Sequence, residues 1–234
     1  METIEPSKPL GQRAESYWIE SRRPLASLIF LAPLLLVYEV SVSMGWAYQN
    51  GGDAFLRKLL DLLGLSQHFL LPLLLVFILL GWHHLSHQPW RISGSVLSGM
   101  AVESLLLGLG LRVLSLTPGI LLLSIGEGTK QAIAFIGAGV YEELLFRLIL
   151  FSAITWAFQR AGTAPRASLL LGVVISSLLF AAAHNIGPYG DPWQPWPFLF
   201  RTMAGVFFAL VYQYRGFGIA AGSHFAYDVI VGLL

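Results

Sequence analysis

The sequence predicts an all-α fold, a polytopic bundle of transmembrane helices around an intramembrane polar cavity. Of its 234 residues, 56% are hydrophobic and only 12% are charged, a composition typical of a protein that is solvated by lipid. Several apolar runs approach or exceed the roughly 20 residues that a helix needs to cross the hydrocarbon core. The net charge of +1 gives no support for nucleic acid binding, and the absence of cysteine excludes disulfides and thiolate metal sites.

Seven spans are predicted, and they follow a polar N-terminal tail at residues 1–24 that lacks the layout of a cleaved signal. Their expected ranges are 25–47, 68–85, 94–116, 130–157, 167–184, 197–214 and 217–234. The apolar stretch Pro118–Ile125 is too short to cross the membrane alone. It is either a re-entrant turn or a further half-span, so a count of eight stays open.

Two connections have compositions of their own. In Asp53–Leu63 the apolar residues lie on one helical face and the charges on the other, which predicts a helix along the membrane interface. Asn185–Pro197 contains four prolines and two tryptophans, which predicts a loop at headgroup level. Lysines and arginines number eight on one predicted side and five on the other, which favours a cytoplasmic N-terminus.

Three ionisable residues lie within six positions of the fourth span: Glu142, Glu143 and Arg147. A charge at the bilayer centre costs roughly 2.5 to 3.5 kcal/mol on insertion scales, so such groups usually face a protein interior or water and have a function. Glu143 and Arg147 share a helical face, whereas Glu142 projects about 100° away. A structural ion pair does not need the second glutamate, which is suited to act as a general base.

Two other spans contribute further titratable side chains. His184 ends the fifth span, and His224 and Asp228 are four residues apart on the seventh. A carboxylate next to a histidine orients its ring and fixes its tautomer. Because three spans each supply ionisable groups, we expect these side chains to converge on one cavity.

Three motifs, taken together and in this order, resemble the signature of the CPBP family. They are Glu142-Glu143-x-x-x-Arg147, Phe180-x-x-x-His184 and His224-x-x-x-Asp228. The family comprises the CAAX proteases and bacteriocin-processing proteins, and its eukaryotic relatives are the type II CAAX prenyl endopeptidases. The resemblance covers residues 132–234, which it implies to be a catalytic helical core, whereas residues 25–131 are expected to be N-terminal helices of the bundle.

The resemblance implies an intramembrane endopeptidase in which Glu142 and His184 activate a water molecule for attack on a peptide carbonyl. His224 would then stabilise the oxyanion. Many relatives carry asparagine where this chain has Asp228. A carboxylate cannot donate a hydrogen bond to an oxyanion, so we expect Asp228 to orient His224 instead.

A metal-free mechanism is favoured, with Zn²⁺ or another divalent metal as the alternative. The family is often labelled metalloprotease, and Glu142, His184 and His224 are ligand types that zinc accepts. However, the sequence has no His-Glu-x-x-His motif, and adjacent glutamates on one helix do not easily converge on one ion.

The expected partners are the lipid bilayer and a membrane-anchored protein or peptide, cleaved near its terminus in CAAX-type processing or in removal of a sorting or leader peptide. No nucleic acid partner is expected. The expected location is the plasma membrane of a prokaryote. A non-enzymatic role, as an ion-coupled carrier or a bacteriocin self-immunity protein, is the alternative, because acids and histidines in a membrane also relay protons.

Other polar residues of the spans are expected to be structural. Glu39 and Glu103 should pair within the bundle or lie near water, and a role in supporting the cavity is the alternative. The histidines at 83, 84 and 87 should form an interfacial polar belt, and a metal clip is the alternative. Ser176 and Ser177 lack the strained elbow of a serine nucleophile, which argues against a serine protease.

Overall fold

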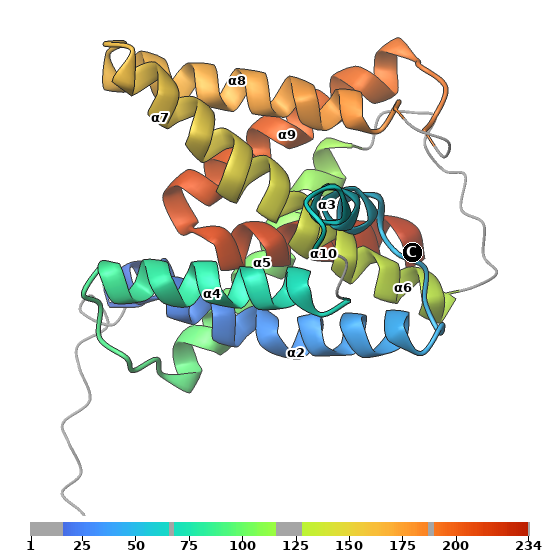
Figure 1. Ribbon diagram of the computed structural model, residues 1–234, viewed down its shortest axis with the longest axis horizontal. Coiled ribbons are helices and arrows are strands. Elements are labelled where there is room, and N and C mark those ends of the chain that lie inside the picture. Colours follow the sequence, from blue (N-terminus) through green and yellow to red (C-terminus); the bar gives the residue numbers. More distant parts are fainter. Residues whose placement is uncertain (1–15, 66–67, 116–127, 187–189, 234) are drawn as a thin grey trace, which may run out of the picture.

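The computed structural model describes residues 16–65, 68–115, 128–186 and 190–233, and every regular element within these ranges is a helix (Figure 1). Seven helical segments of the described residues correspond to the seven predicted spans. They are α2 (Pro24–Ser43), α4 (Leu70–Leu85), α5 (Gly94–Leu114), the continuous run α6–η1–η2–α7, α8 (Pro165–Ala183), α9 (Pro195–Arg215) and α10 (Phe217–Leu233). The predicted all-α bundle is therefore confirmed, and the half-span proposed at Pro118–Ile125 lies outside the described residues.

Four helices are long and apolar enough to cross a membrane by length and composition alone: α2, α5, α8 and α9, among the residues described. Helix α4 is apolar but shorter. Pro33 lies inside α2, and prolines begin α2, α8 and α9, where the missing N–H costs nothing. The first turn of each of these three helices is thus fixed by a proline.

Helix α10 lies at the centre of the bundle, in contact with α2, α5, α6, α9 and η1. Residues 220–223 are all small and buried, so neighbouring helices approach closely. A Cβ atom on Gly222 would lie 2.5 Å from Ser104 Oγ, which shows how little room is left. The helix that carries His224 and Asp228 is therefore enclosed on several sides.

The fourth span is wound differently from the α-helix that the spacing predicted. It begins as α6 (Gly128–Gly137), continues as the π-helices η1 (Ala138–Glu142) and η2 (Leu144–Phe151), and ends as α7 (Ser152–Arg160). A π-helix has i→i+5 hydrogen bonds, is rare, and often occurs at functional sites. A span that is apolar on all sides has no periodicity that reveals its winding, so the sequence could not predict this.

The end of the predicted N-terminal tail packs against the bundle. Residues 16–20 are helical, and Tyr17 donates a hydrogen bond of 2.5 Å to Glu103 Oε2. Arg215 donates to Glu103 and to Ser21, at 2.5 and 2.9 Å. Residues 16–23 of the predicted polar tail are therefore held against the bundle by Glu103 and Arg215. The pairing of Glu103 within the bundle is confirmed.

Helix α3 (Gly51–Leu62) forms where the interfacial helix was predicted, but its inner polar residues point into the protein. Phe55 and Leu59 are exposed, whereas Asp53 is fully buried and forms an ion pair with Arg57. Arg57 also contacts Glu39 of α2, so Glu39 pairs within the bundle as expected. Burial raises the pKa of the Asp53 carboxyl, and the Arg57 guanidinium opposes that shift.

Two remaining regions differ in detail from the expectations. The proline-rich connection is non-helical at residues 190–194, and α9 begins at Pro195, two residues before the predicted end of the loop. His83 is fully buried, with its ring edge-on to that of Trp90 at 4.6 Å between centroids. His84 and His87 are exposed.

Candidate active site

The structure brings the six predicted site residues to one place inside the bundle. They are Glu142 and Glu143 at the junction of η1 and η2, Arg147 in η2, His184 at the C-terminal end of α8, and His224 and Asp228 in α10. Gly139 is the point of closest approach between η1 and α10, since a Cβ there would lie 2.7 Å from the Ala221 carbonyl oxygen. This close approach of the η1 and α10 backbones lets the side chains of Glu142 and Glu143 reach His224.

Glu143 is the hub of the site. Its Oε1 atom lies 2.9 Å from an Arg147 nitrogen and 2.8 Å from His224 Nδ1. A carboxylate only accepts, so the His224 Nδ1–H donates and Nε2 points elsewhere. Asp228 Oδ2 lies 3.6 Å from that Nε2, which is too long for a direct hydrogen bond. In the structure the His224 ring is thus held by Glu143 from the neighbouring helix, and Asp228 lies beyond hydrogen-bond distance of it.

Arg147 is enclosed by aromatic rings as well as by its carboxylate partner. Its guanidinium carbon lies 4.4 Å from the centroid of Phe180 and 5.5 Å from that of Phe208. The guanidinium also donates a hydrogen bond of 3.3 Å to the carbonyl of Gly205. Aromatic faces stabilise a desolvated guanidinium, which explains how a fully buried arginine is accommodated.

Phe208 also stacks on the ring of His224, with centroids 4.5 Å apart and planes 19° apart. Nothing in the sequence separates Phe208 from the other phenylalanines of the spans, so it was not among the predicted site residues. Gly205 is a close-packing position, because a Cβ there would lie 2.9 Å from Ser177 Cα. Its carbonyl contact to Arg147 had no signal in the sequence, because any residue has a carbonyl.

Glu142 faces both histidines without touching either. Its Oε2 lies 4.0 Å from His184 Nε2 and 4.0 Å from His224 Nε2. This oxygen is buried and has no hydrogen-bond partner within the described residues. The His184 Nδ1 lies 2.9 Å from the Phe180 carbonyl, so in the neutral ring Nδ1–H donates there and Nε2 carries the lone pair. A gap of 4.0 Å is too long for a hydrogen bond but suits a bridging water.

Exposure increases in one direction across the site. The exposed fraction of the side chain is 0% for Glu143, 6% for His224 and 11% for Glu142. It rises to 19% for Asp228 and 29% for His184. Of these side chains, His184 at the C-terminal end of α8 is therefore the most exposed.

Comparison with known proteins identifies the segment that contains this site. Residues 129–230 match the family model described as Type II CAAX prenyl endopeptidase Rce1-like. The matched segment is called the Rce1-like domain below. All six site residues fall inside it, and α2, α3, α4 and α5 precede it. The resemblance that the three motifs indicated is thereby confirmed, and the domain is that of an endopeptidase family.

One curated relative is the sporulation-killing factor biosynthesis protein SkfC of Bacillus subtilis (strain 168). The two chains are 25% identical over 96 residues, which is 41% of this chain and 17% of SkfC. The matched stretch is thus about a sixth of the length of that relative. No solved structure shows a significant match. Together, the Rce1-like domain and the apolar helices describe an integral membrane protein.

The site of the Rce1-like domain contains ligand types suitable for a metal, but they are not arranged around one. Across the described residues, no three His, Asp or Glu side chains group closely enough to hold a metal ion. Glu143 is engaged by Arg147 and His224, which leaves Glu142, His184 and His224 as the expected set. These three do not fit a metal site in the arrangement seen.

Ser176 and Ser177 of α8 lie near the Rce1-like site, and the hydrogen bonds described for their hydroxyls stay within their own helix. Ser176 and Ser177 both donate to the Val173 carbonyl, at 3.3 and 2.6 Å. Both side chains are buried. Neither hydroxyl is paired with a histidine, as a serine nucleophile would need to be.

Proposed function

We propose that this protein is an intramembrane endopeptidase that cleaves a membrane-associated protein or peptide near its terminus. The observation that supports this best is the Oε2 atom of Glu142. It is buried, it has no partner among the described residues, and it lies 4.0 Å from an imidazole nitrogen of His184 and of His224. Buried polar atoms are normally satisfied, so this position suits a water molecule or a substrate group.

The proposed reaction begins with a water molecule held between Glu142 and His184. Glu142 takes a proton from this water while the water oxygen attacks the scissile carbonyl carbon. A C–O bond forms, and the carbonyl oxygen becomes an oxyanion. The intermediate collapses when the C–N bond breaks and the proton on Glu142 passes to the leaving nitrogen. His184, with Nε2 directed at Glu142, accepts a hydrogen bond from the water and fixes its direction.

His224 is proposed to stabilise the oxyanion. Because its Nδ1–H donates to Glu143, its Nε2 can donate only when the ring is a cation. Three carboxylates surround the ring, Glu143 at 2.8 Å, Asp228 at 3.6 Å and Glu142 at 4.0 Å, and nearby negative charge favours the imidazolium. We assign Asp228 to this electrostatic role. No step requires a metal.

The substrate class is part of the proposal. The Rce1-like family model supports CAAX-type processing of a prenylated terminus. SkfC is named for biosynthesis of a killing factor, which supports processing of a peptide precursor, although the match covers only 17% of that protein. The eight lysines and arginines on the predicted N-terminal side, against five on the other side, support a cytoplasmic N-terminus in a prokaryotic plasma membrane.

The test uses full-length protein purified in detergent with two probes, a farnesylated CAAX peptide and a membrane-anchored peptide without a prenyl group. The unchanged protein should cleave at least one of them. Glu142→Gln should lower the rate by about 10² or more, because the amide keeps the shape but is not a base. Asp61→Asn, which changes an exposed carboxylate on α3, is the matched control. Normal cleavage by Glu142→Gln would refute the proposal.

A further inference from the structure

Helix α3 lies outside the Rce1-like domain, yet its first turn touches the proposed base. Asn50 caps this turn, and its side-chain oxygen accepts a hydrogen bond of 2.7 Å from Gly52 N. A Cβ atom on Gly52 would lie 2.8 Å from Glu142 Cγ and 3.2 Å from Glu142 N. The backbone of α3 therefore forms a wall against both the side chain and the main chain of Glu142.

The neighbouring glycine shows that this contact is local to one position. A Cβ atom on Gly51 would have no heavy atom of the described residues within 4 Å. Both glycines are in the first turn of the same helix, so an alanine at either would change helix propensity to a similar extent. Only the alanine at Gly52 would press on Glu142.

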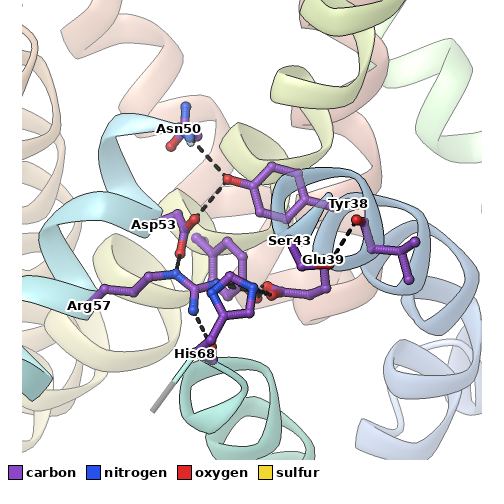
Figure 2. Close-up of polar contacts among 9 residues, drawn as sticks. Tyr38, Glu39, Ser43, Asn50, Asp53, Arg57 and His68 are labelled. Atoms are coloured by element: carbon purple, nitrogen blue, oxygen red, sulfur yellow. Dashed lines mark hydrogen bonds and ion pairs between the residues drawn. The ribbon is translucent and has the colours of Figure 1, made fainter. Parts of the chain in front are cut away.

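A buried ionic cluster fastens α3 in this position, as Figure 2 shows. We call it the α3 anchor, and it consists of Tyr38, Glu39, Asp53, Arg57 and Tyr141. Arg57 donates to Asp53 Oδ1 at 2.5 Å and to both oxygens of Glu39 at 3.0 Å. Tyr38 donates to Asp53 at 2.9 Å. Two carboxylates, a guanidinium and a phenol thus join α3 to α2 at a buried contact.

The anchor also reaches the catalytic segment itself. Tyr141, which immediately precedes Glu142, donates a hydrogen bond to Glu39, and its side chain is fully buried. Its ring lies 5.7 Å from that of Tyr38. The Tyr38 hydroxyl in turn accepts from Asn50 N at 3.0 Å. The first turn of α3 and the residue beside Glu142 are therefore held by the same group of side chains.

We propose that Gly52 is a positioning residue for Glu142 and that the α3 anchor holds it in place. This inference rests on the proposed function, because it concerns the base of that reaction. Glu142 lies between α3 on one side and the two imidazole nitrogens at 4.0 Å, so any displacement by α3 alters the space for water. A misplacement of about 1 Å costs roughly 10² in rate.

The first experiment compares Gly52→Ala with Gly51→Ala in the full chain, purified in detergent, with the probe peptide that the unchanged protein cleaves. Gly52→Ala should lower kcat by about 10- to 100-fold at a KM within about twofold of the original, because the base moves and the peptide-binding surface does not. Gly51→Ala should keep both constants within about twofold. Equal kcat for the two variants, or a change confined to KM, would overturn the proposal.

A second pair of variants covers the case in which Gly52→Ala does not fold. Glu39→Gln weakens the α3 anchor, whereas Glu103→Gln weakens a comparable buried pair with Arg215 at the N-terminal tail. Glu39→Gln should lower kcat by about 10-fold more than Glu103→Gln when both are assayed well below their unfolding temperatures. Equal losses of kcat would mean that the anchor acts only on stability and would overturn the proposal.

A readout without cleavage separates this inference from the proposed function. The rate at which a hydrophobic carbodiimide labels Glu142, measured by mass spectrometry, should change at least twofold in Gly52→Ala and stay constant in Gly51→Ala. Such a change in a protein that cleaves neither probe peptide would leave the positioning contact standing and count against the endopeptidase. Unchanged labelling in an active, folded Gly52→Ala protein would count against the positioning contact and leave the endopeptidase standing.

Discussion

Replacing Arg147 with methionine should destabilise the protein more than replacing Arg147 and Glu143 together with neutral residues. Methionine keeps most of the length of arginine and removes its charge, and Glu143→Gln removes the opposite charge. The two side chains are buried and their charged atoms are 2.9 Å apart. The comparison therefore asks whether Arg147 is needed because it neutralises Glu143.

The magnitude follows from the contacts of the pair. Removing one partner of a buried ion pair costs about 3 to 5 kcal/mol, since the other charge is left uncompensated. His224 stays on Glu143 at 2.8 Å, which places the cost near the low end. Loss of the guanidinium contact with Phe180 at 4.4 Å adds about 0.5 to 2 kcal/mol. In the double variant no lone charge is buried, so a favourable coupling of about 1 to 3 kcal/mol is expected.

The assay is thermal unfolding of the four proteins in one detergent, with the free energy of unfolding from a denaturant titration as a check. For a chain of this size 1 kcal/mol corresponds to about 2 to 4 °C, so the combined cost of about 3.5 to 5 kcal/mol should lower the unfolding temperature of Arg147→Met by roughly 7 to 20 °C. The double variant should recover part of that loss. If the losses in free energy of unfolding of the two single variants simply add in the double variant, the neutralising role of Arg147 is refuted.

Two further predictions concern the chemistry of the site. Asp228→Asn should keep the cleavage rate within about 10-fold of the original, because Glu143 still orients the His224 ring. His224→Ala should lower the rate by about 10² to 10³, as loss of an oxyanion donor does. Initial rates from peptide chromatography measure both, and an inactive but folded Asp228→Asn protein would show that the negative charge is indispensable. Incubating the purified protein with a zinc chelator should leave the cleavage rate unchanged, and a loss of activity that added Zn²⁺ restores would establish a metalloprotease.

The membrane spans and the identity of the polar motifs could be predicted from the sequence. A helix that crosses lipid must satisfy its own backbone and be apolar over its length, so the positions of α2, α5 and α8 follow from composition alone. A charged residue in such a helix is costly, so Glu142 and Arg147 stand out without any structure. The cost of burying polar groups in lipid therefore allows both the spans and the site residues to be recognised from short stretches of sequence.

The pairing of the site residues was decided only by the tertiary structure. The i,i+4 spacing predicted that Asp228 lies next to His224. In the folded protein, however, the His224 Nδ1–H donates to Glu143, which lies between η1 and η2 and faces α10. Spacing along one helix limits which side chains share a face, and it contains no information on what a neighbouring helix presents to that face. The winding of η1 and η2 and the stacking of Phe208 on His224 were hidden for the same reason.

Helix α3 shows this division most clearly. Its amphipathic pattern over Asp53–Leu63 predicted a helix with one apolar and one polar face, and the helix spans Gly51–Leu62. A polar face satisfies its charges equally well with water or with buried partners, so the pattern could not say which of the two it meets. The polar face of α3 meets buried partners because Arg57 pairs with Glu39, which also accepts from Tyr141. These contacts also hold Gly52 next to Glu142.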